Sequence, residues 1–181
     1  MIDLFFGMVQ GITEFLPISS SGHLVILSEL FNSNNLSTYE IAFLHLGTFF
    51  SILIFYLKDI VSILKNKDTF IKISKLILVG IVPAAAFGLF LPISTIIDES
   101  SAILAITSIA YIFIGVILYF ADKLDEGNKS VLDLTIKESL LIGFAQALAL
   151  FPGVSRSGIT LSTALYLKLK KTEAIFFSLL L

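Results

Sequence analysis

Two short polar segments carry the side chains with which this chain could do chemistry. The first spans residues 10–23 and reads QGITEFLPISSSGH. It supplies a carboxamide, a carboxylate, three adjacent hydroxyls and an imidazole, from Gln10, Glu14, Ser19, Ser20, Ser21 and His23. Gln10 and Glu14 are four residues apart, so they share one face of a helix. The serines precede a further apolar run, and the unpaired N–H groups and dipole at the start of a helix there would favour an anion.

The second segment, residues 152–160, holds the only arginine of the chain. It reads PGVSRSGIT, and it adds three hydroxyls to the guanidinium of Arg156, from Ser155, Ser157 and Thr160. An ionisable group between stretches that are apolar enough for a membrane is a functional-site hypothesis by default. The planar fork of a guanidinium suits phosphate or carboxylate oxygens. The segment therefore predicts an oxyanion site.

The second segment is nearly a copy of the first. A shift of 136 residues superimposes six residues without a gap, namely Gly7, Gln10, Phe15, Ser19, Ser21 and Gly22 on Gly143, Gln146, Phe151, Ser155, Ser157 and Gly158. Two polar interruptions in corresponding halves of a membrane protein indicate a shared binding site at a repeat interface. We therefore expect the two segments to meet.

Together the segments would form an oxyanion cradle beside a carboxylate and an imidazole, and this set of groups suits phosphoryl transfer. Hydrogen-bond donors and Arg156 would stabilise the negative charge that spreads over a phosphoryl group. Either a serine hydroxyl or a water molecule could attack phosphorus. Glu14 or His23 could accept the proton that the attacking group loses.

Each of these residues also has a purely structural interpretation. Serines beside proline and glycine are often helix caps, and His23 taken alone could be a packed residue. The strongest structural alternative is an ion pair between Glu14 and Arg156 that joins the two segments without any substrate. His45 lies inside a long apolar stretch, where it could make an interhelical hydrogen bond or form a wall of the site.

Composition places the chain in a lipid bilayer. Of its 181 residues 56% are hydrophobic, and only 14% are charged, against about 25% in soluble domains. Such a chain cannot hide its apolar surface inside a water-soluble globule of this size. Cysteine is absent, which excludes a disulfide framework and thiolate metal ligands. The fold class predicted is an all-α integral membrane protein.

Apolar runs predict three membrane spans and two re-entrant hairpins. The spans cover about residues 39–57, 76–97 and 102–121, each near the roughly 20 residues that cross the hydrocarbon. Residues 4–16 and 138–151 are too short to span, and each leads into a Pro/Gly/Ser break followed by a second short apolar piece. Because non-helical backbone at membrane depth must be enclosed by protein or line a wet cavity, we expect both breaks to be shielded from lipid.

Lysine placement predicts the orientation of the spans. All eleven lysines lie in three connections, which hold Lys58, Lys65, Lys67, Lys72 and Lys75, then Lys123, Lys129 and Lys137, then Lys168, Lys170 and Lys171. Connections 32–38 and 98–101 hold none. By the positive-inside rule the lysine-bearing connections are cytoplasmic. The first hairpin then enters from outside and the second from inside, which would let their tips meet within the membrane.

We therefore expect one membrane domain, residues 1–181, built as an inverted-topology repeat. The first repeat covers about residues 1–75 and contains the re-entrant hairpin 2–31. The second covers about residues 138–181 and is incomplete, because its last apolar run stops in mid-span.

The segments QGITEFLPISSSGH and PGVSRSGIT resemble the two signature motifs of the undecaprenyl-diphosphatases, the bacitracin-resistance membrane phosphatases of bacteria. The resemblance implies hydrolysis of undecaprenyl diphosphate to the monophosphate and inorganic phosphate, which regenerates the carrier lipid for cell-wall assembly. It assigns catalytic roles to Glu14, Ser20, His23 and Arg156. A divalent cation, Mg²⁺ or Ca²⁺, is implied as well, with Glu14 as its contact. Some members carry a glutamate where this chain has Gln10, which removes a two-carboxylate clamp here.

The resemblance also sets expectations for partners and location. The remaining hydroxyls of the two motifs, with Gln10, would bind substrate: Ser19, Ser21, Ser155, Ser157 and Thr160. The partners implied are a polyprenyl diphosphate lipid and the bilayer, with no nucleic acid, and the oligomeric state is left open. We expect a multi-pass protein of the bacterial plasma membrane whose site opens to the external face.

Two other functions stay open at this point. Family members continue through further hydrophobic helices, so the resemblance implies a truncated form, which could be an inactive lipid-binding remnant. Inverted repeats with broken helices are also the architecture of transporters, so an organic anion carrier or a flippase for a lipid phosphate is the other alternative.

Overall fold

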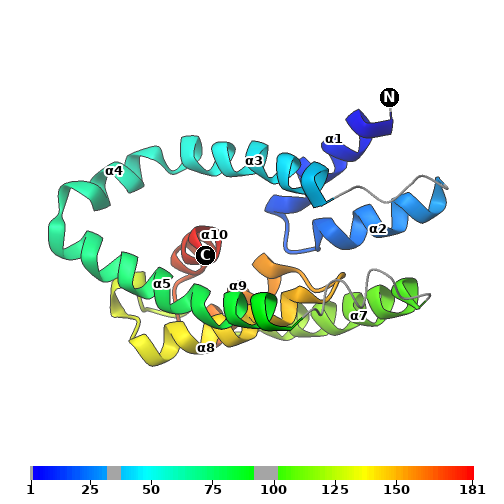
Figure 1. Ribbon diagram of the computed structural model, residues 1–181. Coiled ribbons are helices and arrows are strands. Elements are labelled where there is room, and N and C mark those ends of the chain that lie inside the picture. Colours follow the sequence, from blue (N-terminus) through cyan, green and yellow to red (C-terminus); the bar gives the residue numbers. More distant parts are fainter. Residues whose placement is uncertain (1, 32–37, 92–101) are drawn as a thin grey trace.

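The computed structural model describes residues 2–31, 38–91 and 102–181, and in these ranges the chain is helical (Figure 1). The only β pairing in this described part is an isolated bridge between Lys129 and Leu169. The predicted all-α class is therefore confirmed. Large apolar side chains cover the outside, among them Phe55, Leu89 and Phe90, which are 78–82% exposed, as expected for a surface that faces lipid.

The first predicted hairpin consists of α1 (Ile2–Phe15) and α2 (Ser20–Leu30). Pro17 lies in the break between them, and a proline cannot supply the N–H that a continuous helix would need. Ser19 caps α2 by accepting a hydrogen bond from the Gly22 N–H at 3.4 Å. Its backbone has φ 63° and ψ 93°, a left-handed conformation that is uncommon for a residue with a side chain.

The second hairpin repeats this plan. Helix α8 (Ile136–Ala147) runs through the short 3₁₀ turn η2 (Leu148–Leu150) into the break, and α9 (Arg156–Tyr166) leads away from it. Ser155 caps α9 by accepting from the Gly158 N–H at 3.0 Å, as Ser19 does in the first hairpin. The chain ends in α10 (Lys171–Leu180), and a second short turn, η1 (Val131–Asp133), precedes α8.

Within the described residues, two helices are long and apolar enough to cross a membrane, α5 (Lys67–Phe90) and α7 (Ile103–Asp122). The predicted span 102–121 is thereby confirmed. The predicted span 76–97 was too short at its start, because Asn66 caps α5 by accepting from the Thr69 N–H at 3.1 Å. Residues 92–97 lie outside the described part of the chain.

The predicted span 39–57 corresponds to a helix that ends two residues earlier. Its residues form α3 (Thr38–Phe55), which is followed after a bend of 66° by α4 (Leu57–Lys65). The chain therefore has two membrane-crossing candidates in its described part, or three if this bent pair is a single span. The bend is visible where α3 passes into α4 in Figure 1.

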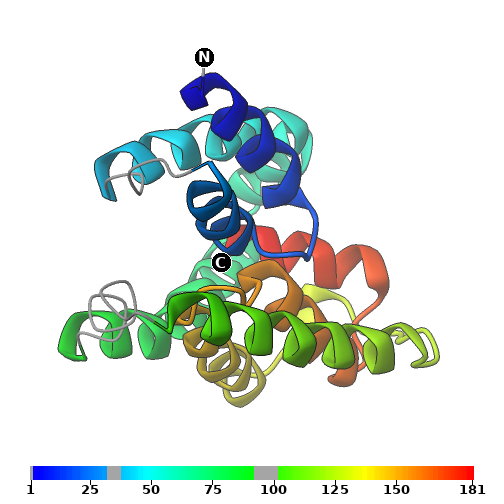
Figure 2. The same cartoon turned by 90° about the vertical axis from the view of Figure 1, so that its right-hand side faces the viewer.

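Small residues bring the helices together. Helix α5 packs most extensively along α8, and a Cβ added at Gly143 would overlap the Gly80 carbonyl. Ser139 donates to the Leu76 carbonyl at 2.6 Å across the same interface. Such close backbone approach with hydrogen bonds is how helices associate in lipid, where apolar burial supplies little drive. Figures 1 and 2 show α1 and α3 on one side of the molecule and α5, α7 and α8 on the other, with α2 and α10 between them.

The two breaks pack against each other through a reciprocal pair of contacts. A Cβ at Gly22 would lie 3.0 Å from the Cα of Gly153, and a Cβ at Gly158 would lie 3.0 Å from the carbonyl oxygen of Pro17. The 136-residue shift superimposes Gly22 on Gly158 and Pro17 on Gly153, so each contact is the counterpart of the other. The opposite orientation of the two halves across a membrane stays a prediction.

Candidate active site

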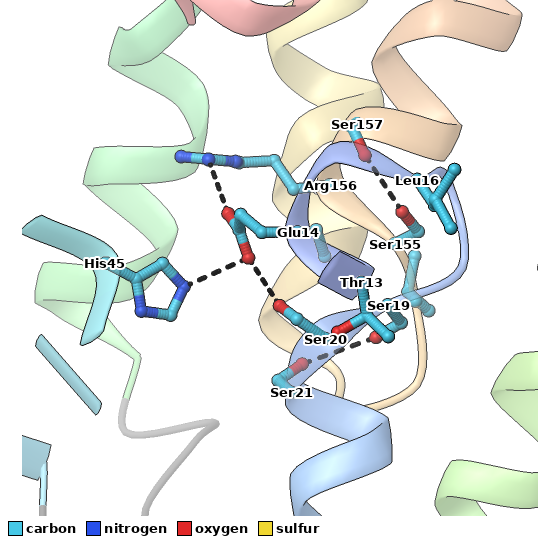
Figure 3. A pocket seen from close by; sticks show the side chains of 12 residues that line it. Thr13, Glu14, Leu16, Ser19, Ser20, Ser21, His45, Ser155, Arg156 and Ser157 are labelled. Atoms are coloured by element: carbon cyan, nitrogen blue, oxygen red, sulfur yellow. Dashed lines mark hydrogen bonds and ion pairs between the residues drawn. The ribbon is translucent and has the colours of Figure 1, made fainter. Parts of the chain in front are cut away.

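A cavity of about 240 Å³ lies between the two breaks. Its wall comes from the end of α1, the turn into α2, the middle of α3 and the turn into α9, and it holds most of the polar residues that the sequence singled out (Figure 3). These are Glu14, Ser19, Ser20, Ser21, Ser155, Arg156 and Ser157, with Thr13 and His45 beside them. Residues more than 130 positions apart in the chain therefore share one cavity.

Glu14 is the centre of the polar contacts in this cavity. Its Oε1 accepts from Nη2 of Arg156 at 3.2 Å, and its Oε2 accepts a short hydrogen bond from the Ser20 hydroxyl. Nε2 of His45 lies 3.4 Å from the same Oε2, and Nε2 of Gln10 lies 3.5 Å from it. One carboxylate thus connects a hydroxyl, an imidazole, a carboxamide and a guanidinium, and Figure 3 shows three of these side chains pointing at it.

The fold explains why these groups converge. Glu14 lies in the last turn of α1, Ser20 is the first residue of α2 and Arg156 is the first residue of α9. Two helix starts therefore reach the cavity, and the first N–H groups of a helix lack partners within it. Their partial positive charge favours an anion in the space between them.

The contacts of the serines distinguish the helix caps from the serine that bonds to the carboxylate of Glu14. Ser19 and Ser155 are helix caps, as the structural interpretation expected, although both also line the cavity. Each cap bonds to the serine two positions on, with Oγ–Oγ distances of 3.3 Å to Ser21 and 3.2 Å to Ser157. Ser20 is different, because its hydroxyl is engaged by a carboxylate that could accept its proton.

Three predicted residues lie near the cavity without lining it. Gln10 is buried beneath Glu14. Thr160 is fully buried, where it donates to the Arg156 carbonyl at 2.8 Å and pairs with Ser178 at 2.6 Å. The structure thus places Thr160 as a support of the first turn of α9. Nδ1 of His23 lies 2.8 Å from the Ser19 carbonyl and 2.8 Å from the hydroxyl of Tyr111.

Two residues enter the site that sequence reasoning did not assign to it. Both alternatives left open for His45 apply, since it lines the cavity and its contact with Glu14 joins α3 to α1. Tyr111 of α7 was not singled out at all. A polar side chain inside an apolar span was the available signal in both cases, since such groups need partners. Which partners they find depends on how the helices pack.

The cavity offers a cation one carboxylate, Glu14, and several hydroxyl oxygens. Within residues 2–31, 38–91 and 102–181, no three His, Cys, Asp or Glu residues form a group that could hold a metal ion. Oxygen donors of this kind suit Mg²⁺ or Ca²⁺, and Mg²⁺ is commonly held by one or two carboxylates together with substrate phosphates. The donor set therefore fits a cation that arrives with a phosphorylated substrate.

Comparison with known proteins settles the family. The model of the family described as Bacitracin resistance protein BacA matches residues 3–181. The chain belongs to this family. Among its relatives are Undecaprenyl-diphosphatase 3 of Bacillus cereus, which is 39% identical over 175 residues, and the undecaprenyl-diphosphatase of Thermosipho melanesiensis, which is 42% identical over 184 residues.

The matches to these BacA relatives cover 97% and 99% of this chain, and 66% and 72% of the two relatives. The undecaprenyl-diphosphatase of Thermosipho africanus gives a similar result, with 43% identity, 97% of this chain and 71% of the relative. This BacA chain thus spans about two thirds of the length of the curated relatives that it matches. Both polar breaks fall within the matched part.

Proposed function

We propose that this chain carries the active site of an undecaprenyl-diphosphate phosphatase. The reaction removes the terminal phosphate of the prenyl diphosphate and leaves the prenyl monophosphate. The observation that carries the proposal is the convergence of Ser20, Glu14 and Arg156 in one cavity between two helix starts. The names of the relatives support the same reaction.

Arg156 would bind the terminal phosphate by exchanging partners. Its side chain is 51% exposed in the cavity, whereas Glu14 is 12% exposed. A mobile guanidinium can turn from the carboxylate to a phosphate that offers more oxygens, with the N–H groups at the starts of α2 and α9 around it. Without substrate, Glu14 is therefore the ion-pair partner of Arg156. When the phosphate binds, Arg156 pairs with the phosphate and Glu14 loses this contact.

The exchange leaves Ser20 in place for attack. When Arg156 turns to the phosphate, Oε2 of Glu14 still holds the Ser20 hydroxyl and can accept its proton. Oγ of Ser20 then bonds to the terminal phosphorus in line, and the bond from phosphorus to the bridging oxygen breaks, which releases prenyl monophosphate. The proton on Glu14 passes to the departing prenyl monophosphate. Water then hydrolyses the phosphoserine, returns a proton to Oγ and frees inorganic phosphate. A direct attack by water in the same cavity would use Glu14 as the base, whereas His23 as the base would have to act from outside the cavity lining.

A divalent cation would be held by Glu14 together with oxygens of the diphosphate. It would neutralise part of the negative charge that develops on the phosphates. The hydroxyls of Thr13 and Ser21 in the cavity wall are further oxygen donors.

The prenyl tail would lie in two apolar grooves beside the cavity. One, of about 590 Å³, runs between α1 and α3, and the other, of about 360 Å³, continues from α3 to Leu179 of α10. Phe15 and Ser51 line both grooves, and Phe15 directly follows Glu14 in the chain. A headgroup at Glu14 would therefore have its tail at Phe15, along a surface that excludes water.

We place the protein in the bacterial plasma membrane with the cavity open to the external face. The lysine-bearing connections support a cytoplasmic location for the opposite side, by the positive-inside rule. In this position the enzyme would recycle the carrier lipid for cell-wall assembly.

Phosphate release from a long-chain prenyl diphosphate by the detergent-purified chain tests the proposal. Release should be lost in Ser20→Ala and kept in Ser108→Ala, a serine on the exposed side of α7 that bonds within its own helix. A short-chain prenyl diphosphate should show a higher KM if the grooves hold the tail. Anion uptake by vesicles without phosphate release would favour a transporter, and neither activity would favour a lipid-binding remnant. Either result would overturn the proposal.

A further inference from the structure

A hydroxyl group in the middle of a membrane-crossing helix reaches the serine-rich break. Tyr111 lies halfway along α7, and its Oη is 2.8 Å from Nδ1 of His23 and 3.2 Å from the carbonyl oxygen of Ser19. Its ring meets the His23 ring edge-on, with centroids 5.6 Å apart and planes at 89°. A buried tyrosine hydroxyl needs a hydrogen-bond partner, and here it joins α7 to the start of α2.

For a neutral His23 ring, the distances among these three polar atoms fit one arrangement of protons. The Ser19 carbonyl can only accept, and Nδ1 of His23 lies 2.8 Å from it, so Nδ1 must carry a proton. The Tyr111 hydroxyl then donates to the Ser19 carbonyl and shares the Nδ1 proton as a second acceptor. The other tautomer would place two lone pairs against each other at 2.8 Å. The neutral ring therefore keeps its free lone pair on Nε2, which makes Nε2 the nitrogen that can accept a proton.

The same contacts fix the peptide group that precedes Ser20. Three groups donate to the Ser19 carbonyl, namely the backbone N–H of His23 at 3.3 Å, its Nδ1 and the Tyr111 hydroxyl. Ser19 has φ 63°, a conformation that persists only where the surroundings hold it. Tyr111 also lies tightly against the backbone here, since a Cβ at Gly22 would come within 2.7 Å of its hydroxyl. The direction in which Ser20 leaves the turn, toward Glu14, depends on this anchor.

We propose that Tyr111 is a positioning residue of the active site. Its hydroxyl holds the Ser19 carbonyl, and with it the Ser19–Ser20 peptide, so that the Ser20 hydroxyl meets Glu14. The same carbonyl holds the neutral His23 ring in the Nδ1–H tautomer. The inference rests on the proposed phosphatase reaction for its kinetic part, whereas the tautomer is a property of the folded chain alone.

Nuclear magnetic resonance of ring-labelled histidine tests the tautomer directly. The chain has only two histidines, so a His45→Gln variant identifies the signals of His23. The wild-type protein in detergent should show neutral His23 with its proton on Nδ1, and Tyr111→Phe should keep it there, because the Ser19 carbonyl remains as the acceptor. A wild-type His23 with its proton on Nε2 would overturn the proposal, because Tyr111 would then donate to Nδ1 and not to the Ser19 carbonyl.

Kinetics provides the second test. Tyr111→Phe keeps the ring and removes the hydroxyl, and the loss of one or two hydrogen bonds that orient the turn should lower kcat about 10- to 30-fold while KM changes less than about twofold. Tyr119→Phe is the matched control, because Tyr119 lies on the same helix with 59% of its surface exposed, and it should leave kcat unchanged. Equal kcat in wild type and Tyr111→Phe would refute the role of Tyr111. Absence of phosphate release from the wild-type chain would refute the phosphatase proposal instead.

Discussion

The two hairpin breaks have the same scaffold and different chemistry. In both, a serine caps the following helix through the N–H of a glycine three residues on, and in both it bonds to a second serine hydroxyl. The 136-residue shift, however, superimposes Glu14 on Leu150 and Ser20 on Arg156. The first break therefore supplies the carboxylate and the hydroxyl, and the second supplies the cation that binds this same carboxylate.

The backbones of the two caps differ as well. Ser19 has φ 63°, whereas Ser155 has φ −69° and ψ 120°, an extended conformation open to any residue. The strained cap is the one beside Ser20 and Tyr111. The comparison indicates that a repeated scaffold brings two helix starts to one cavity, while the residues that differ between its copies supply the carboxylate, the hydroxyl and the guanidinium.

The largest expected loss of kcat tests whether the general base lies in the break of the first hairpin. Glu14→Gln keeps the size of the side chain and removes the charge, so kcat should fall about 10²- to 10⁴-fold, the usual contribution of a general base. Phosphate release from a prenyl diphosphate measures it. Leu150→Glu places a carboxylate at the corresponding position of the second break, and when combined with Glu14→Gln it should restore nothing. Recovery of activity in the double variant would contradict the assigned asymmetry.

The next largest effect concerns the guanidinium. Arg156→Lys keeps the positive charge and loses the fork that can donate two parallel hydrogen bonds. We expect kcat/KM to fall about 10²-fold, comparable with the loss of one donor to a transition-state oxyanion. Steady-state kinetics with the same substrate measures it. Near-normal turnover would favour the structural ion pair over phosphate binding.

Much of this site could be predicted from the sequence, because its signals are local. The lone arginine, the repeated serines and the prolines that break the apolar runs are visible without coordinates, and each follows from the cost of polar groups in lipid. His45 and Tyr111 escaped assignment because their roles arise from packing between α3, α7 and the first hairpin. Helix α4 was not predicted either, because its residues lie in a lysine-bearing connection and not in an apolar run.

A smaller effect should follow from disturbing the reciprocal contact between the breaks. Gly22→Ala and Gly158→Ala each add a Cβ about 3.0 Å from the backbone of the other break. We expect each to lower the free energy of unfolding by about 1–3 kcal/mol, the usual cost of overpacking, measured by thermal unfolding in detergent. Gly115→Ala is the control, because no atom of the described structure lies within 4 Å of its added Cβ. If Gly22→Ala or Gly158→Ala changed the free energy of unfolding no more than Gly115→Ala does, the two contacts would not contribute equally to stability.

The smallest effect distinguishes the two caps. Glycine is only a few tenths of a kcal/mol worse than serine as a cap, but it adopts positive φ without strain. Ser19→Gly should therefore be more stable than Ser155→Gly by about 1 kcal/mol, again by thermal unfolding in detergent. If the two variants lose equal stability, the conclusion that the backbone of Ser19 is more strained than that of Ser155 is wrong.

The central claim is that Glu14 and Arg156 meet around the same phosphate, and binding of a non-hydrolysable prenyl methylenediphosphonate tests it most directly. The affinity should be measured by calorimetry, with a chelator present, for wild type, Glu14→Gln and Arg156→Gln. The account predicts that Arg156→Gln weakens binding about 100-fold, whereas Glu14→Gln binds at least as tightly as wild type, because the carboxylate no longer competes for the guanidinium. Equal affinity in all three proteins would contradict the account and leave the pair as a structural link between the two hairpins.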